Sequence, residues 1–456
     1  MMAGRLRAGA LAAAAGLLLG LVYTASPMTV VSAAVLLATA AWASRGLTAH
    51  ERRWFVGLLT LAVALRAVVI AGLFLSEDSS RPFATLFGDE LFFKNRTLWM
   101  RNVSLGVPIS RADFIYAYEG VGESTYLYLL AYLQAVFGAM PYGVHVMNAT
   151  AYIVGVLAGY QLIRRSFGSV AALIGLALLL YWPSLLMWSV SALKEPAYSL
   201  VAIGELWCTY QIVRAPRPWQ RALAIAGVVA GALALEGLRR GGLVIASIGV
   251  VLGLVAWYLS TRPRAALAAL VVVPIAAAVL LSTSAVQDRV LSGVRRSVSY
   301  HAGHIVSEGY SYKLVEPRYY LETRNIPSMP AREAALYVIR AAVAYFTEPL
   351  PWHAESRLLR AYLPEQMAWF VLLAFVPIGI IAGHRRDAAL TWMLAAQALA
   401  AVVVVAMTSG NIGTLIRHRG LALPYFAWLA ALGICAAIGA TSAGTLSGDG
   451  AQHGHS

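Results

Sequence analysis

The sequence predicts an all-α polytopic membrane protein with about twelve transmembrane helices. Of the 456 residues, 60% are hydrophobic and only 12% are charged, and the mean hydropathy is +0.69. Soluble domains carry about 25% charged residues, so a soluble globular enzyme is excluded. The apolar content also excludes a disordered chain. The apolar residues recur in blocks of about 17–23, the length that a helix needs to cross a bilayer.

Each expected span is a continuous apolar block bounded by polar residues. The twelve blocks cover residues 8–24, 28–44, 54–76, 142–163, 169–187, 196–213, 222–238, 242–260, 265–283, 366–383, 388–408 and 421–440. The first block follows Arg5 and Arg7 and precedes Thr24-Ala25-Ser26, a pattern that a signal peptide would share. We expect an uncleaved helix.

The net charge of +14 is explained by membrane orientation, because the arginines lie mostly between apolar blocks. With the N-terminus in the cytoplasm, one set of short loops collects nearly all of them, as the positive-inside rule requires. The arginines in those loops are Arg5, Arg7, Arg45, Arg52, Arg53, Arg164, Arg165, Arg214, Arg217, Arg221, Arg262, Arg264, Arg385 and Arg386, opposed only by Glu51 and Asp387. The long segments 77–141 and 284–365 then lie outside.

Each long external segment contains an apolar stretch too short to cross a bilayer. Segment 123–138 would invert every later loop if it were a span, so it predicts an interfacial or re-entrant helix, and 331–346 predicts the same. The tail 441–456 is rich in Gly and Ser and is expected to be disordered.

Several acidic residues of the first external segment are candidates for chemistry. Asp89 and Glu90 are adjacent carboxylates, which can activate an acceptor hydroxyl or hold a divalent cation. The alternative is a solvated helix cap, since Asp is a favoured first residue there. Glu119 and Glu123 are candidates for sugar binding, or they belong to a solvated loop.

Two further external turns combine charges with a helix start. In the first, Lys194 can meet a lipid phosphate and Glu195 lies at the positive end of a helix that begins near Pro196. A snorkelling lysine at a plain helix start is the alternative. In the second, Arg239 and Arg240 precede two glycines and a helix, a pattern that suits phosphate. Nonspecific contact with lipid headgroups is the alternative.

The last external turn, 409–419, combines glycines, a hydroxyl, Asn411 and two arginines, Arg417 and Arg419. This arrangement resembles an anion cradle at the start of the final helix. Three ionisable residues lie inside expected spans, where such residues are functional or paired: Arg66, Glu205 and Glu236. Arg66 is a candidate partner for either acid.

The arrangement as a whole resembles the GT-C membrane glycosyltransferases over roughly 54–440. The motifs are Asp-Glu in the first external loop, Phe93, the Leu105-Gly106 pair, the helix from Tyr126 to Phe137-Gly138, and the turn 164–168. The nearest groups are the protein O-mannosyltransferases and the lipid A aminoarabinose transferases. The stretch from Tyr345 to Trp352 and the run 410–419 resemble a bacterial subset found in polysaccharide contexts.

This resemblance implies an organisation along the chain. Residues 1–53 would form two extra N-terminal helices, 54–283 a GT-C-like module with catalytic loop 77–141, 284–365 an external loop with a juxtamembrane helix, and 366–440 the C-terminal helices. The protein would be a multi-pass protein of the bacterial inner membrane, with its active site facing the periplasm.

The resemblance also implies roles for single residues. Asp89 matches the acid that activates the acceptor, with Glu90 beside it, and Glu195 occupies the second acidic position, where Asp is usual. Because Lys precedes Glu195, a metal at that position is not specified. The chemistry of a lipid-phosphate donor, rather than the resemblance, makes Lys194, Arg239, Arg240, Arg417 and Arg419 candidates for contact with the phosphate. The candidates for contact with the substrate are Glu119, Glu123, Tyr126 and Asn411.

The resulting hypothesis is a glycosyltransferase that moves a sugar from a polyprenyl-phosphate donor to an extracytoplasmic glycan or glycolipid. A divalent cation is compatible with it, and nucleic acid is not an expected partner. One alternative is a glycan polymerase or ligase that uses a polyprenyl-diphosphate donor. Another is a transporter of lipid-linked saccharides, with Arg66, Glu205 and Glu236 along the path, although no inverted repeat of the kind common in transporters is visible.

Overall fold

A computed structural model of the chain describes residues 27–76, 85–118, 124–139, 142–306, 311–353 and 357–439, with isolated positions before residue 27. Most of these residues are helical and none belongs to a β-strand, although Ser311 and Asn411 form an isolated antiparallel bridge. The predicted all-α class is therefore confirmed. The first expected span, 8–24, and the tail 441–456 lie outside the continuous described ranges.

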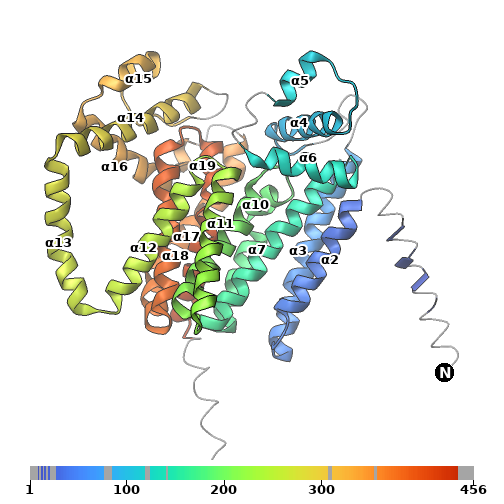
Figure 1. Ribbon diagram of the computed structural model, residues 1–456. Helices are drawn as coiled ribbons and strands as arrows, with labels where there is room; N and C mark the ends of the chain where they lie inside the picture. Colours follow the sequence, from blue (N-terminus) through green and yellow to red (C-terminus); the bar gives the residue numbers. More distant parts are fainter. Residues whose placement is uncertain are drawn as a thin grey trace, which may run out of the picture. The chain divides into compact units, whose positions relative to one another are not determined.

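The chain divides into two compact units. Unit 1 comprises Met1–Leu162, Leu176–Trp207 and Gly227–Leu243, and unit 2 comprises Ile163–Gly175, Cys208–Ala226 and Val244–Ser456. The helices (Figure 1) in the first half of the chain are α2 (Pro27–Ala43), α3 (Ala49–Leu75), α4 (Asp89–Ser104), α5 (Arg111–Tyr118), α6 (Thr125–Phe137), α7 (Gly143–Phe167), α8 (Ser169–Tyr181), α9 (Pro183–Ser189), α10 (Glu195–Arg214) and α11 (Pro218–Leu238).

The helices in the second half include two short 3-10 turns. They are α12 (Gly242–Ser260), α13 (Pro263–Ser282), α14 (Ser284–Val306), α15 (Arg318–Leu321), η2 (Thr323–Ser328), α16 (Ala331–Thr347), η3 (Pro351–His353), α17 (Arg357–Arg386), α18 (Ala388–Thr408), α19 (Ile412–Arg419) and α20 (Leu423–Ala437).

Seven helices of the described residues are long and apolar enough to cross a membrane, and the number rises to nine if each of two bent helix pairs forms one span. The seven are α3, α7, α11, α12, α13, α17 and α18. The pairs are α8 with α9, bent by 64°, and α19 with α20, bent by 60°. Helices α2 and α10 match the expected spans 28–44 and 196–213 but lie outside this set. The chain is thus a multi-pass membrane protein, with fewer candidate spans than the expected twelve.

The exposure of the most apolar helix shows which solvent surrounds it. Helix α13 has a mean hydropathy of 2.6 over its best 18-residue window, and none of that window is buried within the protein. In water, so large an exposed apolar surface would be strongly unfavourable. A lipid bilayer is the solvent in which such a helix is stable.

The two stretches expected to be interfacial are short helices. Helix α6 has 13 residues and α16 has 17. At 1.5 Å per residue, α6 extends only about 20 Å, less than the roughly 30 Å of a hydrocarbon core. Tyr128, Tyr132 and Val136 of α6 are exposed and lie four residues apart, so one face of this helix is apolar along its length.

The break between α8 and α9 is stabilised by the arginine of α3. Pro183 at the first position of α9 ends the preceding helix and leaves its last carbonyl groups without helical partners. Arg66, which is buried, donates to the carbonyl oxygen of Leu180 at 3.2 Å and to Ser189 Oγ at 2.8 Å. Within the described residues Arg66 forms no ion pair with either acid that the sequence offered as its partner, so its role is to cap a broken helix.

Helices α17 and α20 of unit 2 pack at very short range because glycines face each other. A Cβ atom built on Gly379 would lie 1.8 Å from the carbonyl oxygen of Leu429, and one built on Gly433 would lie 2.0 Å from that of Phe375. Small residues allow this approach, and in lipid close backbone packing is a main source of helix association.

Replacing Gly433 with alanine should therefore destabilise the protein by about 1–3 kcal/mol, because the added methyl group collides with backbone that cannot move alone. Thermal unfolding in lipid nanodiscs measures the effect. The matched control is Gly204→Ala in α10, where a Cβ would meet no atom within 4 Å. Equal melting temperatures for the two variants would contradict the close packing.

Candidate active site

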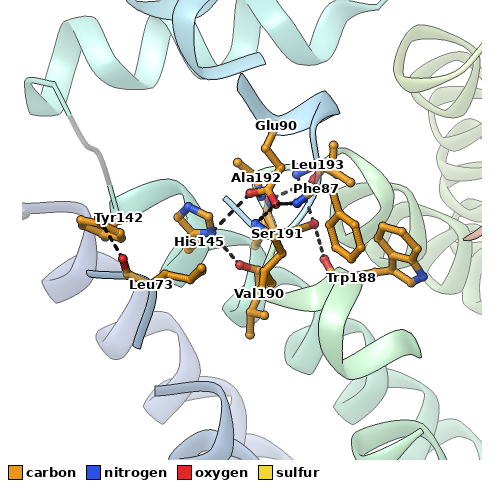
Figure 2. A network of polar contacts seen from close by, with 12 residues as sticks. Leu73, Phe87, Glu90, Tyr142, His145, Trp188, Val190, Ser191, Ala192 and Leu193 are labelled. Atoms are coloured by element: carbon orange, nitrogen blue, oxygen red, sulfur yellow. Dashed lines mark hydrogen bonds and ion pairs between the residues drawn. The ribbon is translucent and has the colours of Figure 1, made fainter. Parts of the chain in front are cut away.

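The carboxylate of Glu90 anchors the first turn of α4 (Figure 2). Its Oε1 accepts hydrogen bonds from the N–H groups of Leu86 and Phe87, both at 2.9 Å. Its Oε2 accepts the N–H of Ala192 at 2.8 Å, from a residue 102 positions away. The side chain is fully buried. Burial raises the pKa of this carboxyl above its ordinary value, and the three N–H donors and the charge of Lys94 oppose that shift.

Two polar residues of α7 hold the same backbone turn, 190–193. His145 Nδ1 lies 2.6 Å from the carbonyl oxygen of Val190 and 3.8 Å from Glu90 Oε2, and Figure 2 shows the ring between these two groups. A carbonyl oxygen only accepts, so Nδ1 carries the proton. Asn148 donates to two other carbonyl oxygens of the turn, at 2.7 Å each. Both side chains are fully buried, and together they fix the path of the turn.

The start of α6 joins this turn to the end of α11. The buried hydroxyl of Tyr126 accepts an N–H from Asn148 at 2.9 Å and lies 3.4 Å from the carbonyl oxygen of Ala192. Ser124 Oγ, at the start of the same helix, donates to the carbonyl oxygen of Leu238 at 3.3 Å. Burial raises the pKa of the Tyr126 phenol well above its ordinary value, and the charges of Glu195 and Glu90 add to the shift.

We call this set of contacts the frame: Glu90, Ser124, Tyr126, His145, Asn148 and the turn 190–193. All of it belongs to unit 1. Its members come from four regions of the chain, and three of these regions contain or adjoin predicted site residues. The frame therefore brings segments that are far apart in sequence into one hydrogen-bonded neighbourhood.

Three predicted site residues lie next to the frame in sequence, and two more follow Leu238, whose carbonyl oxygen accepts a hydrogen bond from Ser124 of the frame. Asp89 precedes Glu90, Lys194 and Glu195 follow the turn 190–193, and Arg239 and Arg240 follow Leu238. Exposure differs among them: Asp89 and Arg240 are exposed, whereas Lys194, Glu195 and Arg239 are half-buried. Each of these residues is less buried than Glu90, although one carboxylate oxygen of Glu195 is itself buried.

The structure separates the two carboxylates that the sequence paired. Glu90 was predicted to be catalytic. Its side chain is fully buried and its oxygens accept three backbone N–H groups, which favours a structural role. Asp89, one residue earlier in the first turn of α4, is exposed. Of the pair, Asp89 is the carboxylate that an acceptor can reach.

In unit 2 the predicted phosphate ligand Arg419 is used within the protein. Its guanidinium donates to the carbonyl oxygens of Tyr345 and Glu348 and, at 2.8 Å, to Gln366 Oε1. It is buried and lies over the ring of Trp369 at 5.4 Å. Arg419 thus caps the end of α16, and this geometry favours a structural role over the predicted phosphate contact.

Asn411 and Arg417 have different surroundings in the structure. The side-chain amide oxygen of Asn411, Oδ1, accepts the N–H groups of Gly413 and Thr414, at 2.8 and 3.4 Å, so it caps the start of α19. These bonds favour a structural role for the side chain that was predicted to meet a substrate. Arg417 is half-buried in the last turn of α19, and the prediction for it stays open.

Glu119 and Glu123 lie outside the described residues, so their predicted sugar contacts are not addressed. Among the residues that the structure does describe, no three His, Cys, Asp or Glu side chains gather closely enough to hold a metal ion.

His145 and Asn148 were not among the residues predicted from the sequence. The signal that indicates them is their place in the first two turns of α7 (Gly143–Phe167), at the end of an expected span, three positions apart. Polar side chains within membrane helices usually face the protein interior and hydrogen-bond there. Comparison with known proteins adds no assignment: no family model, curated protein or solved structure matches the chain.

Proposed function

We propose that the protein is an integral membrane glycosyltransferase of the GT-C type, which moves a sugar from a polyprenyl-phosphate donor to a glycan or glycolipid acceptor. The observation that supports this proposal best is the frame of unit 1. Its hydrogen bonds link the chain segments that carry an exposed carboxylate, Asp89, and three cationic residues, Lys194, Arg239 and Arg240.

Such a grouping matches the chemistry of the reaction. As the acceptor oxygen bonds to the anomeric carbon, the hydroxyl proton passes to the Asp89 carboxylate. The bond between that carbon and the donor phosphate oxygen breaks, and the electron pair leaves with the lipid phosphate. Lys194, Arg239 and Arg240 stabilise the negative charge that develops on the phosphate. No redox step or further reactant is needed.

The membrane arrangement that goes with this function is the twelve-span one, with segments 77–141 and 284–365 outside. In this arrangement α2, α10 and the first apolar block also cross the bilayer, and α6 lies in the outer interface. The protein would be in a bacterial inner membrane with its site facing the periplasm. A donor whose tail stays in the bilayer would then present its reacting carbon at the outer surface, near Asp89.

Purified full-length protein in nanodiscs, incubated with a panel of radiolabelled polyprenyl-monophosphate and polyprenyl-diphosphate sugars and a cell-envelope glycan fraction, tests the proposal. We expect transfer from at least one monophosphate donor, with release of the polyprenyl phosphate. Transfer only from diphosphate donors would favour a polymerase or ligase. Movement of labelled lipid across liposomes without transfer would favour a transporter, and either result would overturn the proposal.

A further inference from the structure

The turn between α11 and α12 already holds an anion, the side chain of Glu236. Glu236 Oε2 accepts the backbone N–H groups of Gly241 at 3.0 Å and Leu243 at 2.9 Å. The turn needs its glycines: Gly241 has a φ of +85°, and a Cβ on Gly242 would lie 2.2 Å from the carbonyl oxygen of Leu235. Two N–H groups that converge on one oxygen form an anion-binding nest.

Arg239 and Arg240 carry positive charge on the same turn. The nest and these guanidinium groups together form a site built for a negative group. In the structure the two N–H groups of the nest are hydrogen-bonded to a carboxylate of the protein itself. Glu236 can reach them because it lies about one helical turn before the nest in the sequence.

A second, independent feature is the hydroxyl of Tyr198, in the first turn of α10. The residue is 4% exposed, and among the described residues its hydroxyl has no hydrogen-bond partner. The charges of Arg239 and Glu236, the arginine and the acid of this turn, act on the hydroxyl, as does that of Glu205. A buried hydroxyl without a partner is unfavourable in proteins. A ligand that accepts a hydrogen bond from Tyr198 would remove this penalty.

We propose that the turn 239–243 binds a phosphate monoester, and that Glu236 is an exchangeable internal anion that occupies the nest when no phosphate is bound. In the bound state the phosphate oxygens accept the N–H groups of Gly241 and Leu243 and the hydroxyl of Tyr198, and the Glu236 carboxylate turns out of the nest. The proposal rests on the proposed function only for the identity of the ligand, the lipid phosphate of the donor.

Exchange follows from charge and geometry. A carboxylate oxygen and a phosphate oxygen accept the same pair of N–H groups, but two anions cannot share the nest without strong repulsion. Glu236 therefore competes with the ligand. An anion that binds only the two N–H groups does not displace the carboxylate. A phosphate that also accepts a hydrogen bond from Tyr198 and interacts with the arginines does displace it.

Replacing Glu236 with glutamine tests the exchange, because glutamine keeps an acceptor oxygen for the nest and loses the charge. Binding of farnesyl monophosphate to full-length protein in phosphatidylcholine nanodiscs should become about tenfold tighter. Asp288→Asn is the matched control: Asp288 is exposed on α14 of unit 2, and the variant has the same net charge. We expect wild-type affinity for it. Farnesol and inorganic phosphate, used as competitors, separate the contributions of tail and phosphate.

Replacing Tyr198 with phenylalanine tests the unpartnered hydroxyl. The affinity for farnesyl monophosphate should fall about five- to tenfold, while the melting temperature stays the same or rises, because a buried group without a partner is removed. A hydroxyl with a purely structural role would give the opposite result, a lower melting temperature with unchanged affinity.

Unchanged or weaker binding by Glu236→Gln would overturn the exchange and leave Glu236 as a helix cap. Binding that farnesol competes away as well as farnesyl monophosphate does would overturn the phosphate site. Both outcomes are independent of sugar transfer. If the protein transfers sugar but Glu236→Gln does not change the affinity for farnesyl monophosphate, only this inference is refuted. If the affinities change as predicted but no sugar is transferred, only the proposed function is refuted.

Discussion

Replacing Asp89 with asparagine should lower sugar transfer by about 10²–10⁴-fold, the usual contribution of a general base, and leave the melting temperature unchanged. Asparagine has almost the same shape as aspartate but cannot take a proton from the acceptor hydroxyl. Asp89 is exposed at the start of α4, and surface substitutions usually change stability by less than about 0.5 kcal/mol. Initial rates with the best donor of the panel measure the effect.

The matched control for this variant is Asp113→Asn. Asp113 also lies in the first turn of an external helix, α5, and its carboxylate accepts a hydrogen bond from Ser110 Oγ at 2.6 Å. We expect it to retain wild-type transfer. Wild-type turnover by Asp89→Asn would remove Asp89 from the mechanism. Equal losses in both variants would indicate a general effect of charge in the loop.

Hydropathy alone predicted much of the fold, because a membrane helix must satisfy its backbone hydrogen bonds internally and present an apolar surface to lipid. The expected spans 242–260 and 388–408 coincide with α12 and α18 to within a residue or two. The expected span 169–187 became two helices bent by 64°. A sequence shows the proline at position 183 but not the arginine of another helix that stabilises the break.

The site was less predictable because burial depends on contacts between distant residues. Asp89 and Glu90 are equivalent in the sequence, and what separates them is the N–H of Ala192, 102 residues further along. The arginines show the same limit. Arg419 was expected at a phosphate and instead caps the carbonyl end of α16, whereas Arg239 lies on a turn whose nest holds an anion. Sequence pattern identified the charged turns but not which charges are already satisfied.

Replacing Glu90 with alanine should destabilise the protein by about 3–9 kcal/mol, because the N–H groups of Leu86, Phe87 and Ala192 would lose their acceptor, and each buried group without one costs about 1–3 kcal/mol. Glutamine at the same position keeps one acceptor oxygen and resembles the protonated acid, so it should be far milder. Thermal unfolding in nanodiscs measures both, with the exposed Asp288→Ala as a control that should shift stability by less than about 0.5 kcal/mol.

The pH dependence of stability, compared between the wild type and Glu90→Gln, gives an independent test. Burial raises the pKa of Glu90 in the folded protein above its ordinary value of 4.5, so the folded state binds this proton more tightly than the unfolded state does. The stability that Glu90 contributes is then complete below the ordinary pKa and is lost as the pH rises through the raised one. The stability of the wild type relative to Glu90→Gln should therefore fall over that window. A difference that is constant with pH would contradict the burial of a titrating carboxyl.

An alanine variant that melts like the wild type but transfers no sugar would return Glu90 to the catalytic role that the sequence suggested.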